Sequence, residues 1–319
     1  MGKINEKYFI YFHHAPASYI YVYNAQMKHI STEKLQLQKN YFGMHFINYK
    51  DFVYIFYQYT QANHVFCKAA KIDSNGKMNK KPVTLSEITL KDYYSHSSIY
   101  NLAYSEDKKK IAIFTVHETE DAHLLNLLIL DQYLNLIQNR IFRIPLMSNY
   151  ESFSDFKIDN EGNFIFLKKD LFDNSDPYKY VINFIGNNST TLSFFNITPT
   201  GIRLNKFVLT IDNSNKILNF FAFYIDSSLS LKALWDDIPI SKAISKSGLF
   251  NATWDIKDKR LTNAATISFH DFLDTGLYNS GLTQLPIQSF IITGVYNFKR
   301  TYLLLGGKIP IRIIPTGKH

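Results

Sequence analysis

The sequence of 319 residues contains a single cysteine, Cys67, so a disulfide within the chain and a metal site built from several cysteines are both excluded. We expect Cys67 to be a buried strand residue. Long apolar runs are also missing, because Leu124–Leu130 and Ile217–Ile225 are much shorter than the roughly 20 residues of a membrane-spanning helix. Met1–Lys7 lack the apolar stretch of a signal peptide. We therefore expect neither a transmembrane segment nor a signal peptide in this chain.

Signatures of several common enzyme classes are absent too. The sequence has no Gly-x-Ser-x-Gly turn, no glycine-rich phosphate-binding loop and no His-Glu-x-x-His pair. Nucleophile-based and nucleotide-dependent enzymes therefore receive no support. The net charge is +8, but lysines such as Lys108–Lys110 lie in polar turns spread along the chain. Because nucleic-acid binding requires a clustered basic face, we expect no nucleic-acid partner.

What the chain does contain is aromatic residues and short alternating apolar runs. Aromatic side chains make up 16% of the sequence, and such residues favour half-buried pleated surfaces. One stretch shows the pattern clearly, with strands expected at Ile99–Tyr104, Ile111–Val116, Leu124–Leu130 and Leu136–Pro145. Four strands in about 47 residues correspond to one blade of a β-propeller.

The same frame of turns recurs along the chain. Asn48–Asp51 and Asp159–Gly162 would connect a first strand to a second strand. Turns between third and outer strands are expected at Asp73–Gly76, Asp131–Asn135, Thr198–Gly201 and Asp255–Lys259. Helical spacing is nearly absent, and only Leu85–Tyr94 is expected to form a short helix.

These patterns predict an all-β fold, a β-propeller of six four-stranded blades, in a single domain spanning residues 1–319. The blades would lie near residues 5–40, 41–90, 91–150, 151–212, 213–268 and 269–319. The alternative is a pair of β-sandwiches, which would use similar strands without a shared four-stranded frame. The end of the chain, 270–319, departs from the pattern, so the closure of the ring stays open.

Two segments carry a resemblance to a known family. IDNEGNFIFL, Ile158–Leu167, resembles the Asp-x-x-Gly-Asn-apolar signature of NHL-like and six-bladed TolB-like propellers. LLILDQYLNLIQNRIFRIPL, Leu127–Leu146, resembles the third-to-outer hairpin of the same blades. The chain is thus similar to uncharacterised propeller proteins of bacterial cell envelopes. The resemblance implies a fold and a periplasmic, cell-surface or secreted location, and it brings no catalytic residues.

The most concentrated polar group is HETEDAH, with His117, Glu118, Glu120, Asp121 and His123 in a loop between two strands. Imidazole and carboxylate groups are good ligands for zinc, but a solvated acidic loop explains the same residues.

A second loop contains Asp170, Asp173 and Asp176, whose oxygens could hold calcium without the spacing of an EF-hand. Both loops follow the second strand of a blade, as does Gln58–His64, so we expect them on one face. We predict no cofactor, with calcium or zinc as the ions these loops could hold. His13 and His14 are expected to be ordinary strand residues that point to opposite faces.

The sequence leaves two functions open. The first is a non-enzymatic binding or scaffold propeller that recognises a protein, peptide or glycan through its loop face. The alternative is a carbohydrate hydrolase or lyase in which acids such as Asp121, Asp173 or Asp237 converge in a central funnel.

Overall fold

The structure is a computed structural model that describes residues 2–14, 17–89, 99–146, 151–170, 179–228, 246–268, 290–298 and 301–308. All of the regular elements in these ranges are β-strands. Within the same ranges, no helix has the length and apolar character needed to cross a membrane. The chain divides into two compact units, Met1–Pro145 and Leu146–His319, which we call unit 1 and unit 2.

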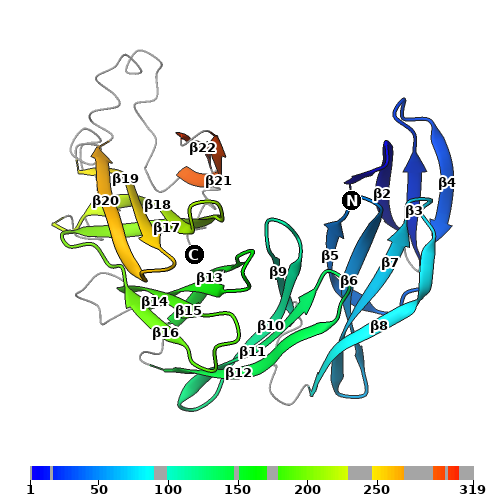
Figure 1. Ribbon diagram of the computed structural model, residues 1–319, viewed down its shortest axis with the longest axis horizontal. Coiled ribbons are helices and arrows are strands. Elements are labelled where there is room, and N and C mark those ends of the chain that lie inside the picture. The colour runs from blue at the N-terminus through cyan, green and yellow to red at the C-terminus, as the bar shows by residue number, and fades with distance from the viewer. Residues whose placement is uncertain are drawn as a thin grey trace, which may run out of the picture. The chain divides into compact units, whose positions relative to one another are not determined.

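Unit 1 contains three four-stranded sheets, each an antiparallel meander in which consecutive strands pair (Figure 1). Sheet 1 consists of β1 (Gly2–Ile4), β2 (Lys7–His14), β3 (Ala17–Tyr23) and β4 (His29–Lys34). Sheet 2 consists of β5 (Tyr41–Asn48), β6 (Phe52–Gln61), β7 (His64–Asp73) and β8 (Met78–Thr89). Sheet 3 consists of β9 (Asn101–Tyr104), β10 (Lys110–Glu118), β11 (Ala122–Asp131) and β12 (Leu136–Pro145).

Unit 2 contains two further four-stranded meanders and a hairpin. Sheet 4 consists of β13 (Glu151–Ile158), β14 (Phe164–Asp170), β15 (Lys179–Ile185) and β16 (Ser193–Asn196). Sheet 5 consists of β17 (Ile202–Asp212), β18 (Ile217–Asp226), β19 (Ser247–Asp255) and β20 (Arg260–Ser268). The hairpin consists of β21 (Phe290–Phe298) and β22 (Thr301–Lys308). The predicted all-β fold of propeller-type, four-stranded blades is therefore confirmed, and the described sheets fit six blades.

The predicted boundary between the fourth and fifth blades is wrong. The turn Thr198–Gly201 was expected to join a third strand to an outer strand of one blade. It instead links β16 of sheet 4 to β17, which pairs with β18 in sheet 5. Glycine-containing turns reverse the chain whichever strands they connect, so turn chemistry alone could not tell these two cases apart.

The predicted short helix at Leu85–Tyr94 is also wrong over Leu85–Thr89, which belongs to β8; the rest of that window lies outside the described residues. The pairing of β7 with β8 skips Leu85, since Cys67 opposes Ser86 and Lys68 opposes Thr84. Leu85 and Ile88 both pack against the same core. A bulge therefore produces an apolar spacing of three residues that imitates helical periodicity.

The core of unit 1 lies on both faces of sheet 2. One cluster joins sheet 1 to sheet 2 through residues such as Phe9, Ile20 and Ile55. A second cluster joins sheet 2 to sheet 3 and includes Cys67, which is buried as predicted. Because both faces are covered, β6 is buried without interruption from Val53 to Tyr59. In contrast, β2 of sheet 1 has exposed positions along its length.

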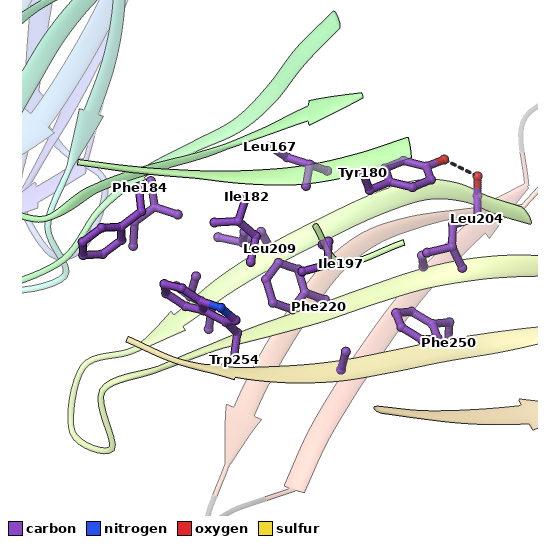
Figure 2. Packing of buried hydrophobic residues seen from close by; sticks show 14 of the residues in the cluster. Leu167, Tyr180, Ile182, Phe184, Ile197, Leu204, Leu209, Phe220, Phe250 and Trp254 are labelled. Carbon is purple, nitrogen blue, oxygen red and sulfur yellow. Dashed lines mark hydrogen bonds between the residues drawn. The ribbon is translucent and has the colours of Figure 1, made fainter. Parts of the chain in front are cut away.

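The core of unit 2 lies between sheets 4 and 5 (Figure 2). Trp254 of β19 is buried there, with its ring centroid 5.7 Å from that of Phe184 and 5.3 Å from that of Phe195. Trp254 is therefore a packing residue of this core. Tyr180 donates a hydrogen bond from its hydroxyl to the carbonyl of Leu204, which ties β15 to β17 (Figure 2).

A one-residue bulge recurs in the first strand of three sheets. Register shifts separate Phe42 from His45 in β5, Ser154 from Lys157 in β13 and Asn205 from Val208 in β17. In β5 and β13, the first residue of the bulge has a positive φ, which is 58° at Gly43 and 54° at Asp155. A left-handed residue at this place is typical of bulges that bend a strand. The three sheets therefore share a structural detail that turn spacing did not reveal.

Candidate functional site

Three hairpin turns lie at the same end of unit 1. Tyr41, the first residue of β5, opposes Tyr59 near the end of β6, and its hydroxyl bonds to the side chain of Ser18 beside the β2–β3 turn. The β2–β3 and β6–β7 turns are therefore neighbours.

The β10–β11 turn lies at this end as well. The Gln58 side chain near the end of β6 accepts hydrogen bonds from the backbone N–H groups of Ile99 and Tyr100, just before β9. Since β9 pairs with Ile111–Phe114 in the first half of β10, the second half of β10 runs on toward the same end. We call this end the hairpin end. Within unit 1, the expectation that Gln58–His64 and His117–His123 lie on one face is thus met.

The predicted loop at His117–His123 is in fact a tight turn with three of its polar residues in strands. His117 and Glu118 end β10, and the backbone N–H of Thr119 bonds to the carbonyl of Ala122 at 2.7 Å. Glu118 opposes His123, so these two side chains share a face, while His117 points to the other face. The two histidines therefore cannot bind one ion together.

Two of the three acidic side chains of this turn have separate partners. The Nδ1 atom of buried His123 lies 4.0 Å from Oε2 of Glu118. Asp121 forms an ion pair with Arg143 of β12, and Glu120 is exposed. Across the described ranges, no group of three His, Cys, Asp or Glu side chains could hold a metal ion.

The second predicted loop lies mostly outside the described residues. Asp170 is the last residue of β14, where its backbone opposes Glu151 and Lys179. Asp173 and Asp176 lie outside the described residues, as does Asp237. The calcium site therefore stays a prediction.

A group of hydroxyls and one imidazole, which the sequence did not reveal, meets at the hairpin end. This polar cluster consists of Tyr11, His13, Ser18 and Tyr41. The Tyr11 hydroxyl lies 3.0 Å from the Ser18 hydroxyl and 2.8 Å from the Tyr41 hydroxyl. His13 Nδ1 lies 2.9 Å from the Ser18 hydroxyl and 2.7 Å from the Tyr41 hydroxyl. Each side chain therefore has at least two polar partners.

The chemistry of the polar cluster suits hydrogen bonding more than nucleophilic attack. Burial, together with the hydrogen bond to Tyr41, raises the pKa of Tyr11 to about 12, so its hydroxyl stays neutral near pH 7. Ser18 is only 2% exposed, which keeps its hydroxyl from reaching a substrate. His13 is exposed, and its ring packs edge-on against Tyr41 with centroids 5.7 Å apart. The cluster therefore presents an imidazole edge backed by fixed hydroxyls.

His13 was predicted to be an ordinary strand residue. It does lie on β2 and points away from the side to which His14 points, as expected. The available signal was the alternation of Tyr11 and His13, with Ser18 just across the short hairpin. Tyr41 could not be found in this way, because it joins through the packing of sheet 2 on sheet 1.

Sheet 4 of unit 2 contains a buried ion pair. Lys168 Nζ lies 2.8 Å from Oε1 of Glu151, and both side chains are buried. The neighbouring Lys169 points to the other face, where burial lowers its pKa. Removing one member of such a pair leaves an uncompensated charge, so Glu151 and Lys168 depend on each other.

The structure also shows two small hollows. One, of about 10 Å³, lies between sheets 2 and 3 beside His45, Gln58 and Cys67, and it has room for about one water molecule. The other, of about 130 Å³, lies at turns of unit 2 and is bordered by Asp159 and by the ion pair of Glu161 with Lys216. Neither is large enough for a drug-sized ligand, which needs at least about 300 Å³.

The sheets define the class of protein, an all-β chain of propeller-type blades. No protein family and no curated protein matches the sequence. Among solved structures, the chain is similar to an oligogalacturonate lyase in complex with manganese at 9% identity and a TM-score of 0.42, covering 82% of this chain and 62% of the lyase.

Two other solved structures show a comparable likeness. The β-propeller domain of the Trilobed protease from Pyrococcus furiosus matches at 10% identity and a TM-score of 0.37, over 86% of this chain and 66% of that one. Hydrazine synthase from Kuenenia stuttgartiensis matches at 8% identity and a TM-score of 0.33, over 78% and 89%. At such identities and scores, the likeness says nothing about activity.

Proposed function

We propose that this chain is a non-enzymatic binding or scaffold protein that recognises a protein, peptide or glycan through the hairpin end of unit 1. The polar cluster is the observation that carries this proposal. Its hydroxyls and imidazole are fixed by one another, and His13 is exposed. Prearranged hydrogen-bonding groups on a rigid sheet are suited to recognition, because little side-chain entropy is lost when a ligand binds.

The β10–β11 turn, on the other side of sheet 2, adds negative charge to the same end. Glu118, Glu120 and Asp121 are all exposed there. They supply recognition groups for a ligand that carries positive or hydroxyl groups. In this proposal Glu118, Glu120 and Asp121, three of the residues predicted from the sequence, remain part of the binding surface, without a metal ion.

The similarity to NHL-like and TolB-like blades supports a second part of the proposal, a periplasmic, cell-surface or secreted location in a bacterial envelope. Fractionation of the cells that produce the protein naturally, with detection by an antibody raised against this chain, would test it. Recovery in the cytosol would contradict it.

The binding proposal is tested with a glycan array and a random-peptide display library. Wild-type protein is compared with the double variant His13→Gln/Tyr41→Phe, which keeps both side-chain volumes but changes their hydrogen bonding. We expect a ligand whose affinity falls about tenfold in the double variant, since two lost hydrogen bonds remove about 0.5–1.5 kcal/mol each. The control is Tyr133→Phe, an exposed tyrosine in the β11–β12 turn.

Two results would contradict the proposal. Equal binding by wild type and the double variant would remove the polar cluster from recognition. Release of new reducing ends from any bound glycan would instead favour the carbohydrate hydrolase or lyase alternative.

A further inference from the structure

The outer strand of sheet 5, β20, leaves a long sheet edge open. It pairs with β19 on one side, and none of the described strands pairs with its other side (Figure 1). Every residue from Arg260 to Ile267 is exposed. Along such an edge, alternate residues direct their N–H and C=O groups away from the sheet, where another strand can bind them. The edge of β20 is therefore a template for one more strand.

The edge is regular over most of its length. The register of β20 against β19 shifts between Trp254 and Thr253, at the beginning of β20. From Asn263 to Ser268, each residue opposes one residue of β19 without interruption. Because bulges twist an edge away from a partner, a stretch without them keeps the spacing of backbone groups that a further ladder requires.

The outer strands of the other described four-stranded sheets are protected against such pairing. Strand β8 carries Lys81 and Pro82, and its register against β7 shifts twice. Strand β12 carries Arg140 and Arg143, and β4 ends at Lys34. Strand β16 is only 4 residues long. Charged side chains, proline, bulges and short length are the usual means by which sheets avoid pairing edge to edge.

No charged residue and no proline lies between Leu261 and Ser268 of β20, where the sequence reads LTNAATIS. Arg260 lies at the start of the strand and pairs with Asp258 in the preceding turn, with 3.4 Å between Nη2 and Oδ2. Propeller-type blades normally leave only short, protected edges. A long edge without charge or proline therefore points to an interaction.

A second copy of the chain fits this edge. We infer that β20 pairs with β20 of a second copy, in an antiparallel arrangement about a two-fold axis. Each chain has a net charge of +8, so two copies repel one another over most of their surface. Contact through β8 or β12 would add lysine against lysine or arginine against arginine, whereas contact through β20 opposes uncharged side chains. Charge thus selects β20 as the place where two copies meet.

The side chains of β20 also suit pairing with themselves. Ala264 and Ala265, in the middle of the strand, are small and point to opposite faces. Thr266 adds a hydroxyl, and Ile267, which is 41% exposed, adds apolar surface. Threonine pairs and apolar pairs across antiparallel strands are stabilising. Because a two-fold arrangement uses the edge of each copy once, the pairing ends at a dimer and does not continue into a fibre.

The first test measures the oligomeric state of the full chain by analytical ultracentrifugation over a range of concentrations. We expect a dimer. Ala264→Lys and, separately, Ala265→Lys should raise its dissociation constant at least about tenfold, because each lysine lies near the same lysine of the second copy. High salt should restore part of the loss by screening this repulsion. The control Asn139→Lys makes the same change of charge at an exposed position of β12 and should leave the dimer unchanged.

The second test uses cysteine cross-linking, which changes the strand very little. Cys67 is the only cysteine of the chain and is buried, so a single new cysteine reports contact between copies. Among Ala264→Cys, Ala265→Cys and Thr266→Cys, the variant closest to the two-fold axis should form a disulfide-linked dimer on mild oxidation. Asn139→Cys should stay monomeric on a denaturing gel.

Several outcomes would overturn the inference. These are a monomer at every concentration, a dimer that both lysine variants leave unchanged, and cross-linking in β20 no faster than in Asn139→Cys. A monomer that captures an extended peptide from a display library, with capture lost in Ala265→Lys, would assign the edge to a strand of another protein. The inference does not depend on the proposed function, because β20 belongs to unit 2 and the hairpin end to unit 1.

Discussion

The hairpins β2–β3 and β10–β11 occupy the same place in their sheets and both end at the hairpin end, on either side of sheet 2, yet they present different chemistry. The β10–β11 hairpin has five charged or imidazole side chains in seven residues, and the strand register divides them between two faces and an exposed turn. The β2–β3 hairpin contributes only Tyr11, His13 and Ser18, and Tyr41 from the next sheet completes a cluster. Whether polar side chains meet in space thus depends on the strand register and on the neighbouring sheet more than on how many polar residues lie close together in the sequence.

The largest effect on stability is expected from core substitutions, which test whether the two hairpins are packed equally firmly. Ile20 of β3 and Leu125 of β11 are both fully buried. Ile20→Ala and Leu125→Ala should each lower the free energy of unfolding by about 2–5 kcal/mol, because each removes apolar contacts and leaves a cavity. Urea denaturation measures both. A small loss in only one variant would show that its hairpin is less firmly packed.

The second largest effect on stability distinguishes the β2–β3 turn from the β10–β11 turn. Ser18→Ala removes a buried hydroxyl that bonds to Tyr11, His13 and Tyr41 and, because several hydrogen bonds are lost together, should cost about 1–3 kcal/mol. Thr119→Ala is the matched change in the β10–β11 turn, where the Thr119 hydroxyl donates to the carbonyl of Ala122 at 2.8 Å but is partly exposed. It should cost less, since water replaces the lost bond. The same denaturation experiment compares them, and an equal or larger loss in Thr119→Ala would contradict the special role of the cluster.

The third prediction concerns alkaline pH. The pKa of Tyr11 is raised to about 12 in the folded chain, above the value of about 10 expected in the unfolded chain. Its contribution to stability is therefore complete below about pH 10 and is lost as the pH rises toward 12. Tyr11→Phe should flatten the fall of the urea midpoint over this window without abolishing it, because burial also raises the pKa of Tyr57 to about 12. An unchanged profile would place the Tyr11 hydroxyl in water.

The smallest effect is expected at the exposed ion pair of the β10–β11 hairpin. Asp121 and Arg143 have side chains that are 65% and 60% exposed. A double-mutant cycle with Asp121→Asn and Arg143→Gln should give a coupling of about 0.2–1 kcal/mol that weakens in 1 M salt. A coupling as large as the effect of Ser18→Ala would remove the energetic difference between the hairpins.

The sequence was informative where a side chain acts on its own turn. Asp131 was recognised as a turn residue, and its carboxylate accepts hydrogen bonds from the backbone N–H groups of Tyr133 and Asn135, four residues away at most. Because such contacts are local, the strands on either side of the turn could be predicted. Considering local contacts alone misassigned the turn Thr198–Gly201, because β17, the strand that follows it, pairs with β18 further along the chain.

The candidate site could be predicted less well for the same reason. His117 and His123 are close in sequence but point to opposite faces, whereas His13 and Tyr41 are far apart in sequence and in contact. Sheet packing, which one sequence does not display, decides both cases. The closure of the blades into one ring, their number and the cellular location stay predictions.

The bulge in β5, β13 and β17 has a practical consequence for comparing the blades by sequence. Gly43, Asp155 and Lys206 occupy the same place in their strands although the three residues differ in type. The blades can be aligned on these positions and not on the aspartate turns. Such an alignment gives sheet 3 a one-residue gap, because its first strand, β9, pairs with β10 without a register shift. A search profile built on that alignment would detect distant relatives that turn-based profiles align one residue out of step.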